Sequence, residues 1–165
     1  MGIGPVPATR KALSRAGLSA TDAGTWTLAD IRAGLAQVTA GTQELFVPQQ
    51  INLDLTGAIN FRKGCYPGQE IVARMHYRGR PTRRMVRLAL PAGAPPAPGA
   101  CVYGTAADAP VAETVCAAPV GDGAELLAVV KLGALDGPLH LHEPGGPALE
   151  RLDLPYTVPE LAGDA

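Results

Sequence analysis

The stretch RRMVRLALP, Arg83 to Pro91, marks the point where the sequence changes from a helical to an extended pattern. After it, short apolar runs follow one another, separated by glycine and proline: CVYG (101–104), PVAETVCAAPV (110–120), ELLAVVKL (125–132) and GPLHLHE (137–143). Short strands at regular spacing with such punctuation are typical of a small antiparallel barrel or sandwich. We therefore predict a C-terminal antiparallel β-barrel over residues 81–165.

The residues before this stretch predict helices, so the expected fold class is α+β with a mixed α/β part over residues 1–80. ATRKALSRAG and TWTLADIRAG are typical of two helices that end at Gly17 and Gly34, and Thr25 is a candidate cap of the second. LFVPQQINLDL, at 45–55, predicts a short strand and a turn of helix. The 165 residues are 47% hydrophobic, which is enough for one ordinary domain or two very small ones.

KGCYPGQE, residues 63–70, places a thiol at the predicted start of a helix. Pro67 suits the first helical position because its missing N–H would have no intrahelical partner, and Gly79 suits the end. Cys65 would then lie beside unpaired backbone N–H groups and near Lys63, which favours the thiolate and predicts a lowered pKa. The ordinary alternative for a free cysteine is a buried small apolar residue, and both interpretations stay open.

The cysteines and histidines elsewhere predict structural roles. Three widely spaced cysteines without a CxxC pattern argue against a disulfide framework or a zinc site, and favour a reducing, cytoplasmic compartment. Cys101 and Cys116 lie in apolar stretches that predict strands, so both are expected to be core residues. His140 and His142 would share one strand face but lack a third ligand, so no metal site is expected. No apolar run is long enough to span a bilayer.

Basic residues concentrate in the middle of the chain. Eight of the 14 lie between residues 62 and 87, with Glu70 as the only acid among them, whereas the region from Leu88 onward is acidic. Such a stripe is either a solvated face or a surface that binds anions, such as tRNA phosphates. We expect no base recognition there, because aromatic residues do not alternate with the basic ones.

ADIRAG, FVPQQINLDLTGAINFRKGCYPGQEIVAR and the arginines that lead into the first strand resemble the YgfZ family of folate-binding proteins, relatives of the glycine-cleavage T-protein. The resemblance extends by motif over about residues 26–86. It implies tetrahydrofolate as cofactor, iron–sulfur proteins or their assembly factors as partners, and a role in tRNA modification. It implies Cys65 as the functional or catalytic residue. Candidate cofactor-binding residues are Lys63, Tyr66, Gln69, Glu70, Arg32 and Arg78.

Two departures from the family shape the functional expectation. The resemblance implies a longer protein, whose N-terminal half is absent from this sequence. Arg32, in IRAG, occupies the place of a folate-contacting glutamate of the T-protein, so aminomethyl transfer is not expected. The leading hypothesis is an accessory protein for iron–sulfur cluster assembly or repair, including that of tRNA-methylthiolating enzymes. An aminomethyltransferase-like enzyme and a non-catalytic binding module are the alternatives.

Overall fold

The computed structural model describes residues 6–61, 64, 67–79, 81–105 and 107–159. Three α-helices precede six strands in this part of the chain, which confirms the α+β class. The elements are α1 (Val6–Arg15), α2 (Ala23–Ala33), α3 (Gln69–Arg78), β1 (Arg83–Leu90), β2 (Cys101–Gly104), β3 (Ala112–Val120), β4 (Gly123–Lys131), the 3-10 helix η1 (Leu132–Ala134), β5 (Leu139–Leu141) and β6 (Ala148–Leu152).

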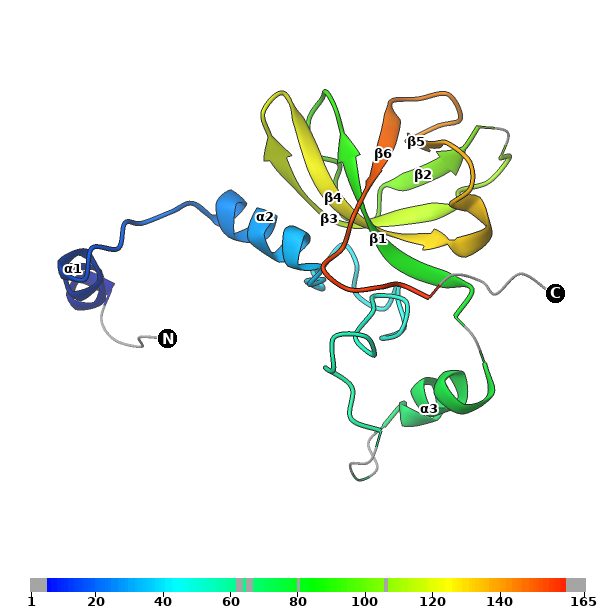
Figure 1. Ribbon diagram of the computed structural model, residues 1–165, viewed down its shortest axis with the longest axis horizontal. Helices are drawn as coiled ribbons and strands as arrows, with labels where there is room; N and C mark the ends of the chain where they lie inside the picture. Colours follow the sequence, from blue (N-terminus) through cyan, green and yellow to red (C-terminus); the bar gives the residue numbers. More distant parts are fainter. Residues whose placement is uncertain (1–5, 62–63, 65–66, 80, 106, 160–165) are drawn as a thin grey trace.

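The six strands form a closed antiparallel barrel in the order β1-β4-β3-β2-β5-β6 (Figure 1). The predicted barrel is therefore confirmed, and each predicted extended run contains one strand. Strand β6, which closes the barrel by pairing with β1 and β5, was not predicted. Its sequence, ALERL, is short and half polar, so it lacks the apolar run that indicated the other strands.

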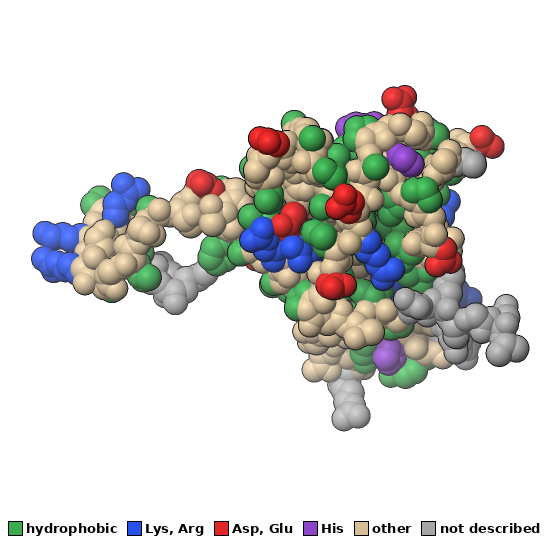
Figure 2. Space-filling view, turned by 45° about the horizontal axis from the view of Figure 1, so that its top comes forward, with side chains coloured by type: hydrophobic (Ala, Val, Ile, Leu, Met, Phe, Trp, Pro, Cys, Tyr) green, Lys and Arg blue, Asp and Glu red, His purple; other side chains and the backbone are tan. Residues whose placement is uncertain are grey.

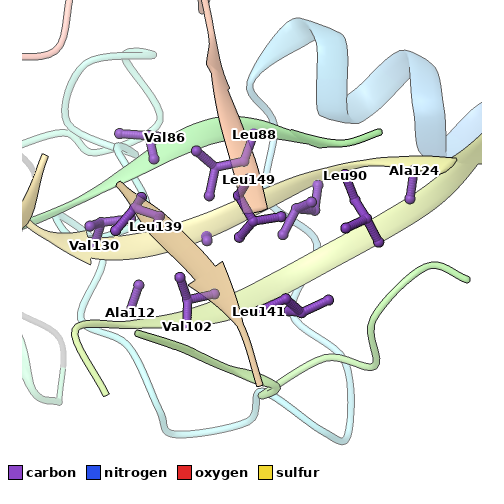
Figure 3. Close-up of a cluster of buried hydrophobic side chains, with 12 residues drawn as sticks. Val86, Leu88, Leu90, Val102, Ala112, Ala124, Val130, Leu139, Leu141 and Leu149 are labelled. Atoms are coloured by element: carbon purple, nitrogen blue, oxygen red, sulfur yellow. The ribbon is translucent and has the colours of Figure 1, made fainter. Parts of the chain in front are cut away.

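The interior of the barrel is an aliphatic core (Figure 3). Strand β4 shows how the period-2 alternation builds it, because Ala124, Leu126, Ala128 and Val130 belong to this core. The same core also contains Val86, Leu88, Leu90, Val102, Ala112, Leu139, Leu141 and Leu149. Within the described residues, aliphatic side chains fill the inside of this small barrel.

A second core lies on the outer surface of the barrel, where α2 packs against β3 and β4. Leu127 and Val129 of β4 alternate with the interior residues and belong to this outer core, together with Ile31 of α2. Eight of the nine residues of β4 are therefore buried. The predicted boundary near residue 80 stays a prediction, but α2 from the front part shares a core with the barrel.

Two capping residues explain where α2 begins and ends. Asp22, rather than the predicted Thr25, is the N-cap: its carboxylate accepts a hydrogen bond from the Thr25 backbone N–H at 2.6 Å, so the helix begins earlier. Gly34 ends the helix as predicted, in the left-handed conformation with φ of 68°. A Cβ atom at this position would lie 2.6 Å from the Tyr156 ring, so glycine is also required for space.

The segment between α2 and α3 forms successive turns, and the short strand predicted in 45–55 is wrong. Asn52 explains part of the difference, since its φ of 60° is incompatible with a strand. Helix α1 buries none of its side chains and lies apart from the barrel (Figure 1). None of the helices in the described residues has the length and apolar character needed to cross a membrane.

Candidate functional site

Helix α3 begins inside the KGCYPGQE stretch, at Gln69, two residues later than predicted. Gly68 is the N-cap residue and has a left-handed φ of 81°, so the helical conformation cannot extend back to Pro67. Gly79 ends the helix as predicted. Glu70 is exposed in the first turn and Gln69 is half-buried. Cys65, Lys63 and Tyr66 lie outside the described residues, so their proposed roles stay predictions.

A buried amide holds α3 against the turn segment. Val72 is the buried residue of the helix, and its carbonyl oxygen accepts a hydrogen bond of 2.6 Å from Gln49 Nε2. In the same segment, Asn52 Nδ2 donates to the Met85 carbonyl of β1 at 2.8 Å. These two buried side chains therefore connect the motif-bearing helix to the barrel. Within the described residues, Gln49 Oε1 and Asn52 Oδ1 are buried acceptors without a hydrogen-bond partner.

A buried ion pair joins the same turn segment to β1. The Arg84 guanidinium makes two contacts with the Asp54 carboxylate, at 2.6 and 3.0 Å, and also donates to the Gln49 carbonyl at 2.7 Å. Arg84 is only 5% exposed. The sequence offers Arg84 as one of the basic residues that could bind an anion, but the structure engages it inside the fold.

Arg32, a predicted cofactor contact, forms part of an ion-pair cluster between α2 and the barrel. Its Nη2 lies 2.7 Å from Glu125 Oε1, and Arg87 Nη2 lies 2.7 Å from Glu125 Oε2. The hydrogen bonds from Arg32 lower the pKa of Glu125, against the opposing effect of burial, and Arg87 lowers it further. Arg32 keeps half of its side chain exposed, so its role toward a cofactor remains a prediction.

The basic stripe is therefore not one continuous free surface. Besides Arg84 and Arg87, Arg83 pairs with Glu113 at 2.8 Å, so all three barrel arginines of the stripe have acidic partners. Arg74 on α3 is exposed. Figure 2 shows basic and acidic side chains next to one another over the barrel, whereas the basic side chains of α1 gather at its far end. Among the described residues of the stripe, Arg74 is therefore the exposed basic residue that lies on a helix and not on β1.

Aromatic rings meet beside α3, which the sequence analysis did not predict. Phe61 stacks on His76 with ring centroids 3.7 Å apart and an interplanar angle of 15°, and Tyr77 meets His76 edge-on at 4.8 Å. They border a hollow of about 550 Å³, which is also lined by Gly57, Ile59 and Asn60. This cluster could not be predicted from local spacing, because Phe61 lies 15 residues before His76 and only the fold brings them together. The expectation of no base recognition along the basic stripe stays a prediction.

The C-terminal segment closes the other side of the turn segment. Tyr156 donates to the Gly34 carbonyl at 2.7 Å and accepts a longer contact of 3.4 Å from Asn52. Burial raises the pKa of the Tyr156 phenol, which keeps it protonated as a donor.

The sequence prediction that His140 and His142 share a strand face is wrong, since β5 ends at Leu141 and His142 has a φ of 71°.

The sequence of this chain is similar to those of several other proteins. The chain is 34% identical over 143 residues to the tRNA-modifying protein YgfZ of Sodalis glossinidius, which covers 84% of this chain and 44% of that protein. It is 40% identical over 75 residues to the tRNA-modifying protein YgfZ of Blochmanniella pennsylvanica, which covers 46% and 23%. An uncharacterized protein of Haemophilus influenzae is 52% identical over 61 residues, 36% of this chain and 22% of that protein. No family model matches the chain.

The fold and site define a β-barrel protein that carries a KGCYPGQE motif before a helix tied to the barrel by buried amides. The relatives confirm the resemblance seen in the sequence, and the chain belongs to the YgfZ family. It spans less than half the length of the curated relatives that it matches.

Proposed function

We propose that this chain acts in tRNA modification as part of a YgfZ-like protein. The observation that carries the proposal is the 34% identity over 143 residues to a protein named for tRNA modification. The structure adds support, because the helix that follows KGCYPGQE is tied to a closed barrel through Gln49 and Asn52. A motif supported in this way has one end fixed to a rigid scaffold, as a functional site requires.

The finer proposal is an accessory role in iron–sulfur cluster assembly or repair, with tetrahydrofolate as cofactor. Gln69 and Glu70 fit a folate contact, since both lie in the first turn of α3 and carry polar groups that can hydrogen-bond a heterocycle. Arg32 fits only through its exposed half, because Glu125 already engages its guanidinium. Lys63, Tyr66 and Arg78 complete the proposed set. Bound tetrahydrofolate would supply one-carbon chemistry.

Cys65 is the residue on which this role depends, and its replacement provides the first test. In a host that lacks its own YgfZ, we expect Cys65→Ala to abolish rescue of iron–sulfur enzyme activity and of tRNA methylthiolation, because the thiolate is lost. Cys101→Ala is the matched control, since Cys101 is a half-buried residue of β2 and should rescue normally. Full rescue by the Cys65→Ala chain would contradict the role proposed for Cys65, and no rescue by the unaltered chain would contradict the accessory role.

Titration with tetrahydrofolate separates a cofactor-dependent protein from a non-catalytic binding module. We expect saturable binding at sub-millimolar concentration, measured by calorimetry, and weaker binding after Glu70→Gln if that carboxylate contacts the ligand. Glu150→Gln provides the control, because Glu150 is an exposed acid on β6 at the barrel. A flat titration with the unaltered chain would favour the binding module.

A further inference from the structure

The aromatic hollow beside α3 has features that packing alone does not explain. Only 4% of the residues are aromatic, yet three aromatic or imidazole rings converge at this one place. Tyr77 is 72% exposed, so the ring contributes little to any core. Large exposed aromatic side chains at the rim of a hollow are a frequent sign of a binding surface.

The shape of the hollow suits a flat ligand. Phe61 and His76 lie nearly parallel, and Tyr77 stands at 78° to His76, so the rings form a corner rather than a continuous stack. Gly57 on the lining has no atom within 4 Å of where a Cβ would lie, which leaves this side open. A volume of about 550 Å³ falls within the range of small-ligand sites and exceeds what one planar base needs.

The charge around the hollow favours an anionic ligand. Arg74 is exposed on α3 and lies three positions before Tyr77, so the two share one side of the helix. Residues 61–80 contain five basic residues and one acid, Glu70. On the barrel, in contrast, Arg83, Arg84 and Arg87 are paired with acids. Among the described basic residues, Arg74 therefore lies on the helix that carries the exposed Tyr77 ring, whereas those of β1 are paired with acids.

We propose that this hollow binds an unpaired nucleotide of single-stranded RNA. Its base would stack on the exposed ring of Tyr77, and its phosphates would face Arg74. Stacking on aromatic rings combined with a basic surface is how proteins bind single strands with little sequence preference. The inference rests on the proposed role in tRNA modification, and it narrows the partner from tRNA as a whole to an unpaired segment. Helix α3, which carries His76 and Tyr77 of the hollow, lies below the barrel in this view and away from α1 (Figure 1).

Fluorescence anisotropy with a labelled single-stranded oligoribonucleotide tests this proposal. We expect saturable binding by the full chain, and a loss of about 5- to 150-fold after Tyr77→Ala, because one stacking ring is removed. Tyr77→Phe keeps the ring and should bind nearly as tightly. Trp26→Ala is the matched control, because Trp26 is 63% exposed on α2, apart from the hollow, and should leave binding unchanged.

Salt dependence and competition test the phosphate contact and the single-stranded preference. Arg74→Gln should weaken binding uniformly across sequences and lower the slope of log affinity against log salt by about 1. A duplex of the same sequence should compete poorly, because its bases are already stacked. Thermal unfolding of each variant verifies that exposed substitutions leave the fold intact.

Several results would overturn the proposal: no saturable binding, equal affinity after Tyr77→Ala, an equal loss after Trp26→Ala, or stronger binding of the duplex. Its failure can be told apart from failure of the proposed function. If RNA binding is insensitive to Tyr77 while rescue still requires Cys65, only this inference is wrong. If RNA binding requires Tyr77 while the unaltered chain fails to rescue tRNA methylthiolation, the proposed function is wrong and the RNA site stands.

Discussion

At the scale of single residues, Gly34 combines two constraints that usually occur apart. Its φ of 68° is a conformation that side-chain-bearing residues adopt only with strain, and Tyr156 occupies the space where a Cβ would lie. The Tyr156 hydroxyl also donates to the Gly34 carbonyl. One glycine therefore ends α2 and provides the contact point for the C-terminal segment.

We expect Gly34→Ala to lower the free energy of unfolding by about 2–4 kcal/mol, from left-handed strain together with the clash against Tyr156. The measurement is chemical denaturation followed by circular dichroism. Gly121→Ala is the control, because Gly121 has a φ of 57° but no atom within 4 Å of the new Cβ. It should cost only the conformational part, about 1–2 kcal/mol. Equal losses in the two variants would show that the clash is relieved at no cost.

The interaction partners of the buried side chains in the turn segment could not be predicted from the sequence. Gln49, Asn52 and Asp54 look like ordinary polar loop residues in the sequence, and a motif match alone assigns them no partner. Asp54 lies 30 positions from Arg84, and Arg32 lies 93 positions from Glu125. Such pairs obey no local spacing rule, so only the fold reveals that three arginines of the basic stripe are structural.

At the scale of elements, α2 is attached to the barrel by an apolar face and by the Arg32–Glu125–Arg87 cluster. Glu125 faces outward on β4 between Leu127 and the turn with β3, and its side chain is 10% exposed. A carboxylate in that position requires its two guanidinium partners, because an unpaired buried charge is costly. The ion pairs therefore position the helix, while the apolar contacts supply most of the burial.

We expect Glu125→Gln to destabilise the protein by about 1–3 kcal/mol at neutral pH, because two charge-assisted hydrogen-bond partners are lost. The pKa of Glu125 is lowered in the folded state, so the unfolded state binds its proton first as the pH falls. The stability that Glu125 provides is complete above its ordinary pKa of 4.5 and is lost below it, as the pH falls through the folded value.

The difference between wild type and Glu125→Gln should therefore shrink between neutral pH and pH values below 4.5, measured by denaturant unfolding at each pH. Glu113→Gln is the control for an ion pair on the barrel surface. Its partner Arg83 and Glu113 itself are 28% and 29% exposed, so the loss should be below about 1 kcal/mol. A wild-type advantage that stays constant down to acidic pH would contradict the role assigned to Glu125.

Helix and strand positions were largely predictable, because each depends on local chemistry. Gly34 ends α2 in the left-handed conformation that glycine favours, Gly79 follows the last residue of α3 in an extended conformation, and glycine or proline separates the strands. The errors occurred where local signals compete. Asp22 rather than Thr25 caps α2, Gly68 delays α3, and the half-polar β6 lacked an apolar run.

At the scale of the whole molecule, the closed barrel was predictable from periodicity, but its outer core was not. The sequence shows that β4 is apolar along its length, which fits a strand buried on both faces, yet it does not say what covers the second face. The aromatic hollow could not be predicted for the same reason. Its rings come from a turn and from α3, which lie side by side only in the folded chain.

Strand β4 contributes side chains to both cores, so the stability of one core is coupled to that of the other. Removing α2 would expose Leu127 and Val129, and opening the barrel would expose the neighbouring interior residues of the same strand. We therefore expect loss of either core to weaken the other, because both depend on the same strand. Helix α3, which is joined to this unit through Gln49, should share that coupled stability.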